Sequence, residues 1–254
     1  MAEPLLQIEG LSKRFGGIIA SNNVSLDIAT GELHAIIGPN GAGKTTLIAQ
    51  LTGELTPNAG HVRFGGVDIT QTPPFRRSLL GLARSFQITS VFPDLTVLDN
   101  VALAVQAHAG HSFRFWRKAR RDTALREPAR AALARVGLIG RDEAIVGTMS
   151  HGDHRQLEIA MALATRPRML LLDEPMAGMG PDESARLVTT LRELKKDYTI
   201  LLVEHDMDAV FALADRISVL VYGRVIATGL PDEIRNNAEV KQAYLGDETR
   251  VSHA

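Results

Sequence analysis

The chain has 254 residues, 45% of them hydrophobic, which is enough for one large α/β domain with a substantial core or for two small domains. Its 28 basic and 29 acidic residues nearly cancel, which excludes the strongly basic surface typical of nucleic-acid-binding proteins, so we predict no nucleic-acid partner. The absence of cysteine excludes a disulfide framework and a thiolate zinc site, and favours a cytosolic location.

The N-terminus and the apolar runs predict neither a targeting segment nor a membrane span. The first ten residues lack the basic and apolar regions of a signal peptide. A helix that crosses a bilayer needs about 20 apolar residues, whereas runs such as Met169–Leu172 and Val219–Tyr222 are short and end in charge or glycine. We therefore expect any role at a membrane to depend on partner proteins.

The N-terminal part of the chain predicts short strands joined by turns. Alternating or continuous apolar runs predict strands over residues 5–8, 24–28, 33–37 and, before a Gly-Gly hairpin turn, 61–64. The third strand enters a glycine-rich loop, and a helix over residues 44–51 follows. Gly53 and Pro57 are expected to end this helix, because glycine suits a helix C-terminus and proline cannot continue a helix.

The middle of the chain, between Gln87 and Met149, changes to helical spacing. Ala, Leu and Arg dominate residues 97–137, which favours a helical subdomain inserted into the sheet domain. From Gln156 onward, helices and strands alternate again, with helices expected over 156–164 and 181–194 and strands over 169–172, 200–203 and 217–221. Buried apolar strands that alternate with helices predict an α/β fold with a mostly parallel sheet.

These patterns predict a single domain over residues 1–254. Its catalytic core is expected at residues 1–87 and 160–246, its helical subdomain at about 88–159, and a short tail at 247–254.

The strongest motif is a phosphate-binding loop. It consists of Gly38, Pro39, Asn40, Gly41, Ala42, Gly43, Lys44 and Thr45, which fit G-x-x-x-x-G-K-[ST] between a predicted strand and a predicted helix. Backbone N–H groups and the helix dipole hold anionic oxygens in such a loop. We expect Lys44 to reach the β and γ phosphates and Thr45 to bind Mg²⁺, and we include Thr46 in the nucleotide site. A glycine turn that only caps a helix would not require Lys-Thr.

A second predicted site follows the strand over residues 169–172. Asp173 and Glu174 are expected at the C-terminal edge of a parallel sheet, where ligands bind. Asp173 can hold Mg²⁺, and Glu174 can polarise an attacking water. Two acids after a buried strand can also form a solvated turn, but together with the phosphate loop they indicate phosphoryl transfer, which depends on positioning and charge neutralisation.

The order of these motifs resembles that of ABC transporter ATPases over almost the whole chain. The elements that carry the resemblance are the phosphate loop, Gln87, the Ser150-to-Asp153 stretch before a helix, Asp173-Glu174-Pro175 and His205. The resemblance implies a P-loop NTPase fold with an N-terminal antiparallel β subdomain and an inserted helical subdomain. It also implies hydrolysis of ATP, with ATP and Mg²⁺ as cofactors.

Individual roles follow from the same resemblance. It implies that Phe15 stacks on adenine, that Gln87 binds Mg²⁺ and reports nucleotide state to a partner, and that His205 contacts the γ-phosphate. The alternatives are a core phenylalanine, an ordinary loop glutamine and a structural histidine.

The signature stretch of the family is altered in this chain. Ser150 and Gly152 keep the residue types that can grip the γ-phosphate of an ATP held by the opposite subunit, although Ser150 could also be a helix N-cap without a ligand. The resemblance therefore implies a dimer of ABC ATPases with two shared sites. Gly180 stands where the family usually has an aspartate or asparagine that crosses the dimer interface.

The amino-acid sequences of several segments resemble those of the ATPases of branched-chain amino acid importers. These segments are 13–17, 150–160 and 243–246, together with a lengthened helical subdomain. The branch implies transmembrane permease subunits, a second identical or related ABC ATPase, and indirectly a periplasmic solute-binding protein. It also implies a peripheral location on the cytoplasmic face of the inner membrane.

The basic aromatic segment 111–121 of the helical subdomain has two interpretations. It could contact the permease or anionic lipid, or it could be a solvated basic helix.

Other functions remain open at this point. Urea or amide importers, lipopolysaccharide exporters and, less readily, soluble ABC ATPases of translation or DNA repair share the same motifs. A GTPase is disfavoured because the chain has no Asn-Lys-x-Asp motif.

Overall fold

The computed structural model describes residues 3–84, 91–109 and 122–243 of the chain. Gln87, the basic aromatic segment 111–121 and the ending Tyr244-Leu245-Gly246 lie outside the described residues, so the expectations for them stay predictions.

Within the described residues, the larger sheet has six strands. Their order is β10 (Arg224–Gly229), β9 (Arg216–Val221), β3 (Leu33–Ile37), β8 (Thr199–Val203), β7 (Met169–Asp173) and β6 (Leu82–Arg84). All neighbouring pairs are parallel except β10 and β9, and every residue of β3, β7 and β8 is buried. Burial on both faces explains why these strands read as continuous apolar runs. The predicted mostly parallel sheet is confirmed.

An antiparallel sheet forms the N-terminal layer. Its strands in the described residues are β2 (Ile18–Ile28), β1 (Leu6–Phe15), β4 (Ala59–Phe64) and β5 (Val67–Asp68). Strands β1 and β2 run well past the predicted ranges, because their ladder continues through register shifts into polar positions such as Lys13 opposite Ser21. The β4–β5 hairpin turns at Gly65 and Gly66, both with positive φ, as the Gly-Gly pair predicts.

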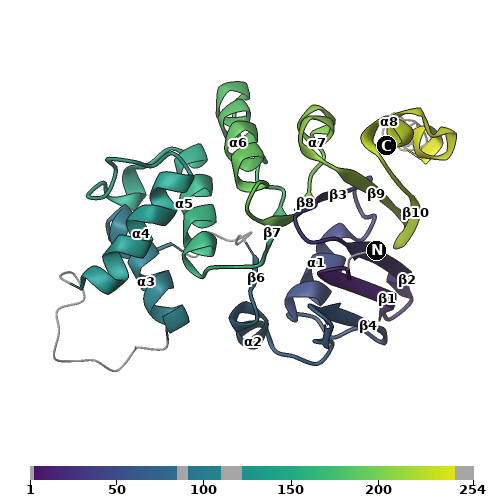
Figure 1. Ribbon diagram of the computed structural model, residues 1–254. Coiled ribbons are helices and arrows are strands. Elements are labelled where there is room, and N and C mark those ends of the chain that lie inside the picture. The colour runs from purple at the N-terminus through teal and green to yellow at the C-terminus, as the bar shows by residue number, and fades with distance from the viewer. Residues whose placement is uncertain (1–2, 85–90, 110–121, 244–254) are drawn as a thin grey trace.

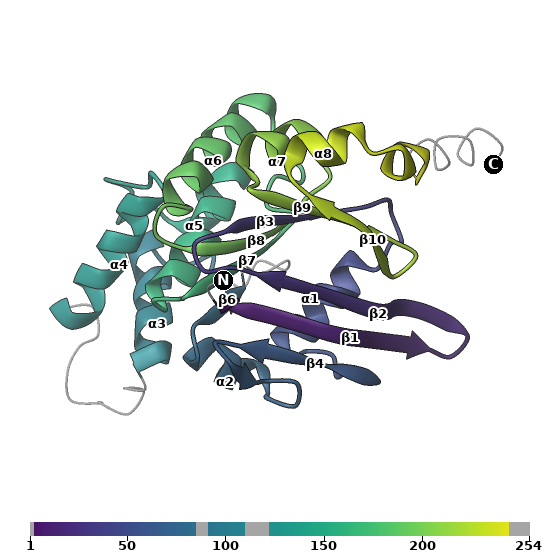
Figure 2. The same cartoon turned by 45° about the vertical axis from the view of Figure 1, so that its right-hand side comes forward.

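Helices cover both faces of the larger sheet. Helix α1 (Lys44–Thr52) lies between the two sheets, where Leu47, Ile48 and Leu51 pack into a core shared by both. On the other face lie α6 (Pro181–Leu194), α7 (Met207–Leu213) and α8 (Pro231–Asn236), as Figure 2 shows. Helix α1 ends at Gly53, whose φ of +83° is left-handed, in agreement with the prediction.

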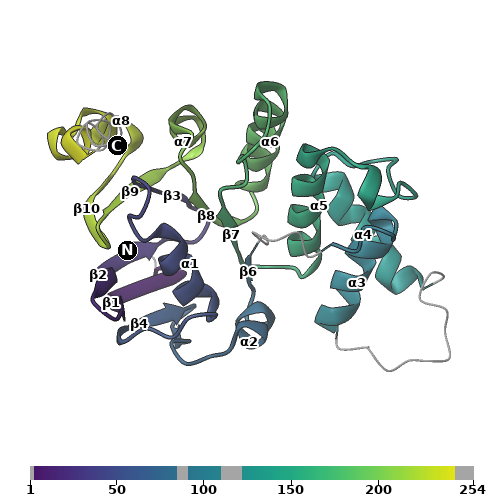
Figure 3. The same ribbon diagram turned by 180° about the vertical axis from the view of Figure 1, so that it is seen from behind.

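The helical subdomain lies beyond the β6 edge of the larger sheet (Figures 1 and 3). It contains α3 (Val97–Ala109), α4 (Thr123–Arg135), the 3₁₀ turn η2 (Val146–Thr148) and α5 (His151–Ala164), while α2 (Pro74–Leu79) lies on the core side. Helix α5 begins earlier than expected, because Ser150 caps it. The expected subdomain boundary at residues 159 and 160 falls inside this helix.

Candidate functional site

The phosphate loop joins β3 to α1 and needs glycine at two close approaches. A Cβ at Gly38 would lie 2.1 Å from the carbonyl oxygen of Leu220, and one at Gly43 would lie 2.2 Å from that of Ala20. Gly43 also has a left-handed φ of +102°. The loop backbone is therefore packed directly against β9 and β2, which explains the glycines better than chain flexibility does.

The buried side chain of Lys44 binds the backbone at the start of the phosphate loop. Its Nζ donates hydrogen bonds to the carbonyl oxygens of Gly38 at 2.6 Å and Pro39 at 3.2 Å. Burial lowers the pKa of Lys44, while the carboxylates of Glu174 and Asp173 oppose this shift. The lysine therefore lies at the same edge of the sheet as Glu174, the predicted water-polarising acid, and Asp173, the predicted Mg²⁺ ligand.

The remaining loop residues differ in exposure. Ala42 is buried, and its carbonyl oxygen accepts a hydrogen bond from the Gly223 N–H at 2.8 Å. Asn40, Gly41 and Thr45 are exposed and Thr46 is half-buried. The exposed rim and the buried base are the arrangement expected of a loop that wraps an external ligand.

The carboxyl ends of β3, β8 and β7 are neighbours, since the strands are adjacent and parallel. This brings the phosphate loop, His205 and the pair Asp173 and Glu174 to one edge, as the motif order predicted. Burial raises the pKa of Asp173, and the guanidinium of Arg84, whose Nη2 is 3.1 Å from Asp173 Oδ2, opposes that shift. Glu174 is half-buried and has a left-handed φ of +47°.

Phe15 and His205 both present exposed side chains. Phe15 ends β1, is 48% exposed and has Lys13 Nζ 5.4 Å from its ring centroid. The phenylalanine is thus not a core residue. The His205 side chain is 62% exposed, and its peptide N–H donates to Glu204 Oε2 at 3.0 Å. Both side chains are available to a ligand.

Ser150 caps the N-terminus of α5 and Gly152 lies in its first turn, against the first turn of α6. The Ser150 hydroxyl accepts a hydrogen bond from the Asp153 N–H and donates one to Glu183 Oε1, each at 3.1 Å. A Cβ at Gly152 would lie 2.6 Å from the same Glu183 oxygen. Ser150 is therefore an N-cap, and its neighbourhood belongs to the helical layer and α6.

The sequence interpretation missed three residues at this site, namely Arg84, Glu183 and Glu204. Arg84 lies in a strand of three residues, too short for periodicity to reveal. Glu204 is an acid directly after a buried apolar strand, which is the same signal that predicted a site at Asp173, and it precedes the predicted site residue His205.

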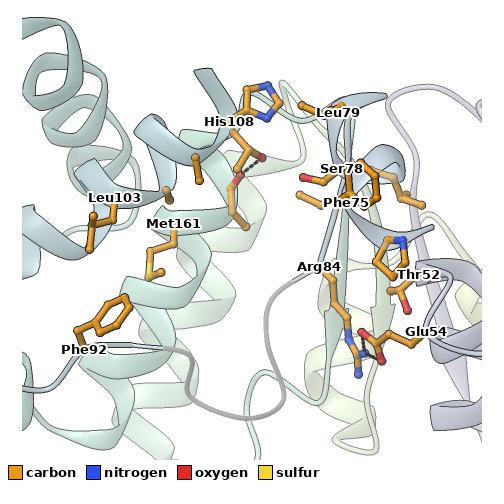
Figure 4. A pocket seen from close by; sticks show the side chains of 17 residues that line it. Thr52, Glu54, Phe75, Ser78, Leu79, Arg84, Phe92, Leu103, His108 and Met161 are labelled. Carbon is orange, nitrogen blue, oxygen red and sulfur yellow. Dashed lines mark hydrogen bonds and ion pairs between the residues drawn. The ribbon is translucent and has the colours of Figure 1, made fainter. Parts of the chain in front are cut away.

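A groove of about 710 Å³ separates the catalytic core from the helical subdomain. Phe75 and Leu79 of α2 line one side, and Leu103 of α3 and Met161 of α5 line the other (Figure 4). Phe75 is 64% and Leu79 59% exposed, which is unusual for large apolar side chains that face a common groove.

Comparison with known proteins decides the family. A family model described as ABC transporter matches residues 21–177, more than half of the chain. The chain belongs to the ABC transporter ATPase family. A second model, described as branched-chain amino acid ATP-binding cassette transporter, matches residues 224–249 of this ABC ATPase.

Full-length relatives support this assignment. The ABC ATPase is 39% identical to the high-affinity branched-chain amino acid transport ATP-binding protein LivG of Salmonella typhimurium and 37% identical to BraF, named for the same transport, of Pseudomonas aeruginosa. Both alignments cover 97% of this chain and 100% of the relative.

Solved structures share the fold. The ADP conformation of an ATP-binding cassette of an ABC transporter superposes with a TM-score of 0.85 at 31% identity, over 96% of this chain and 100% of the other. A nucleotide-free cassette gives 0.84 at 32% identity, over 95% and 99%. The predicted P-loop ABC ATPase fold is confirmed.

Proposed function

We propose that this ABC ATPase powers the import of branched-chain amino acids. The observation that carries the proposal is its similarity, over essentially the full length of both chains, to two proteins named for branched-chain amino acid transport. The match of its C-terminal residues 224–249 to the corresponding family model supports the same branch.

ATP binds at the edge formed by β3, β7 and β8 in this proposal. The phosphates lie in the loop from Gly38 to Thr46, and Lys44 exchanges its loop carbonyls for the β and γ oxygens. Phe15 stacks on adenine with its exposed ring. The exchange is favourable because a phosphate oxygen carries more negative charge than a carbonyl.

Mg²⁺ binds to Thr45, Asp173 and Gln87 in this proposal. The exposed hydroxyl of Thr45 and the buried carboxylate of Asp173 are oxygen donors of the kind Mg²⁺ prefers. In the described residues, no three His, Cys, Asp or Glu side chains gather into a protein-only metal cluster. A site that the nucleotide completes fits this chain better, and the ion supplies charge neutralisation on the phosphates.

Glu174 and His205 act on the reacting end of ATP. Glu174 polarises the attacking water, and the exposed His205 ring contacts the γ-phosphate. Their placement at the ends of adjacent strands β7 and β8 supports these roles.

Two ABC ATPase subunits share the sites. Ser150 and Gly152, at the N-terminus of α5, receive the γ-phosphate bound by the opposite subunit. Gly180 offers no side chain for the usual contact across the interface, which is compatible with pairing to a related second ATPase as well as to an identical copy.

The groove between α2 and α3 receives a permease segment. Its exposed Phe75 and Leu79 suit an apolar face of such a segment. Among the described residues, no helix is long and apolar enough to span a bilayer. We assign the subunit to the cytoplasmic face of the inner membrane, where the permease links it to a periplasmic solute-binding protein and where segment 111–121 could meet the permease or lipid.

Uptake of labelled leucine by cells that carry either the wild-type chain or Lys44→Ala tests this function, with labelled urea as a parallel substrate. We expect the variant to abolish leucine uptake and to leave urea uptake unchanged, because loss of the Lys44 cation removes ATP binding. Unchanged leucine uptake, with the variant protein present at wild-type level, would overturn the proposed cargo.

A further inference from the structure

Glu204 is a buried carboxylate that the proposed chemistry does not use. It directly follows β8, and its side chain is 0% exposed. Its Oε1 accepts a hydrogen bond from the Met176 N–H at 2.8 Å, and its Oε2 accepts one from the His205 N–H at 3.0 Å. Burial raises the pKa of Glu204, and backbone hydrogen bonds from Met176, His205 and Asp206 oppose the shift. One side chain therefore binds the backbone after β7, at Met176, and the backbone that directly follows it after β8, at His205.

The first of these segments is the turn that carries Glu174. A non-glycine residue with a φ of +47° is strained, and such a conformation persists only where its surroundings impose it. The Glu174 N–H donates to the Val203 carbonyl oxygen at 2.8 Å, Pro175 has no N–H, and the Met176 N–H goes to Glu204. The end of β8 thus anchors both sides of the strained residue.

The second segment begins at His205. Besides accepting from the His205 peptide, Glu204 Oε2 lies 3.7 Å from His205 Nδ1, so the carboxylate faces this edge of the ring. Strands β7 and β8 lie side by side (Figure 3), but backbone pairing ends with Asp173 opposite Val203. Beyond that pair, the Glu204 carboxylate joins the Met176 N–H of the turn after Glu174 to the His205 N–H.

We propose that Glu204 is a positioning residue for ATP hydrolysis, which fixes the strained Glu174 turn against the start of the His205 segment. The inference rests on the proposed role of Glu174 as the residue that polarises water. A carboxylate suits this task because each of its two oxygens can accept a hydrogen bond from a different segment, whereas an amide would turn a donor toward one of the two N–H groups.

Steady-state and single-turnover hydrolysis by the purified full chain, with Glu204→Gln, tests the proposal. We expect kcat to fall about 10- to 100-fold while KM for ATP stays within about twofold, because misplacing a reacting group by about 1 Å costs rate rather than nucleotide affinity. Glu32→Gln is the matched control. Glu32 is also a buried carboxylate that accepts a backbone N–H, from Ala29, but it lies at the opposite end of β3.

A double-mutant cycle with Glu174→Gln separates positioning from general destabilisation. If Glu204 acts through Glu174, adding Glu204→Gln to Glu174→Gln should change the residual rate by less than about twofold. The proposal is overturned if Glu204→Gln lowers the hydrolysis rate of the Glu174→Gln variant as much as it lowers that of the wild type. It is also overturned if Glu204→Gln lowers Tm as Glu32→Gln does but keeps wild-type kcat.

The same assay distinguishes this inference from the proposed function. Wild-type hydrolysis by Glu174→Gln alone would reject the catalytic role of Glu174. A slow Glu174→Gln variant with an unaffected Glu204→Gln variant would reject only the positioning role.

Discussion

At the scale of single residues, the site depends on backbone conformations as much as on side-chain chemistry. Glu174 follows the last residue of β7 with a left-handed φ of +47°, and its N–H donates to the Val203 carbonyl oxygen of the neighbouring strand. Replacing such a residue by one of the same shape leaves the backbone unchanged. The chemistry of the carboxylate can therefore be tested separately from its placement.

We expect Glu174→Gln to bind ATP with wild-type affinity and to hydrolyse it at least about 100-fold more slowly, because the water loses its polarising base. Phosphate release and binding of a fluorescent ATP analogue would measure the two properties. Glu193→Gln is a suitable control, since Glu193 is an exposed acid near the end of α6 whose carboxylate pairs with Lys196, three residues further along the chain. Comparable rates for the two variants would contradict the assignment.

At the scale of elements, the phosphate loop is shaped by the strands that it touches. Gly43 meets the carbonyl oxygen of Ala20 on β2, whereas nothing lies within 4 Å of a Cβ added at Gly41, although its φ of +77° is also left-handed. A substitution at Gly41 therefore tests the free-energy cost of a left-handed conformation alone, whereas one at Gly43 adds the cost of a steric clash with the Ala20 backbone.

Gly41→Ala should lower the free energy of unfolding by about 1 kcal/mol, the cost of a left-handed alanine. Gly43→Ala should lower it by about 3 kcal/mol, because overpacking against the Ala20 backbone adds to the same conformational cost. Urea unfolding of the purified variants measures both. Equal losses would show that the loop moves away from β2 without penalty.

At the scale of the whole molecule, the catalytic core and the helical subdomain meet across the groove between α2 and α3. The floor of the groove includes Arg84, which bonds Glu54 through Nη1 at 2.8 Å to each oxygen and Asp173 through Nη2 (Figure 4 shows the Glu54 pair). A partner in the groove would therefore lie one side chain away from the proposed Mg²⁺ site.

Leu79→Glu should prevent recovery of the subunit with permease-containing membranes while nucleotide binding stays intact. The leucine is 59% exposed, so the change should alter stability by no more than about 0.5 kcal/mol while placing a charge in the apolar groove. Ile139→Glu supplies the matched control, because Ile139 is 76% exposed and does not line the groove. Equal membrane recovery of both variants would reject the groove as the permease contact.

Much of the architecture could be predicted from the sequence, and so could the placement of the phosphate loop, Asp173, Glu174 and His205 at one edge of the larger sheet. The bounds of α6 agree residue for residue with the predicted range, and the phosphate loop falls between the expected strand and helix. These features depend on contiguous residues, which show either a periodic pattern of apolar positions or a motif with fixed spacing. Among the elements that escaped prediction, β6 has only three residues and β10 is largely half-exposed, so neither shows a clear period.

The sequence by itself indicated the ABC ATPase family and predicted that the phosphate loop, Asp173, Glu174 and His205 follow strands of one parallel sheet, because the order of these motifs is a property of the linear chain. Only the tertiary structure decided how that edge is held together. The pairs Met176 with Glu204 and Ser150 with Glu183 join residues 28 and 33 positions apart. Such pairs follow from how packed elements approach one another, and no local pattern of hydrophobicity or spacing records that approach.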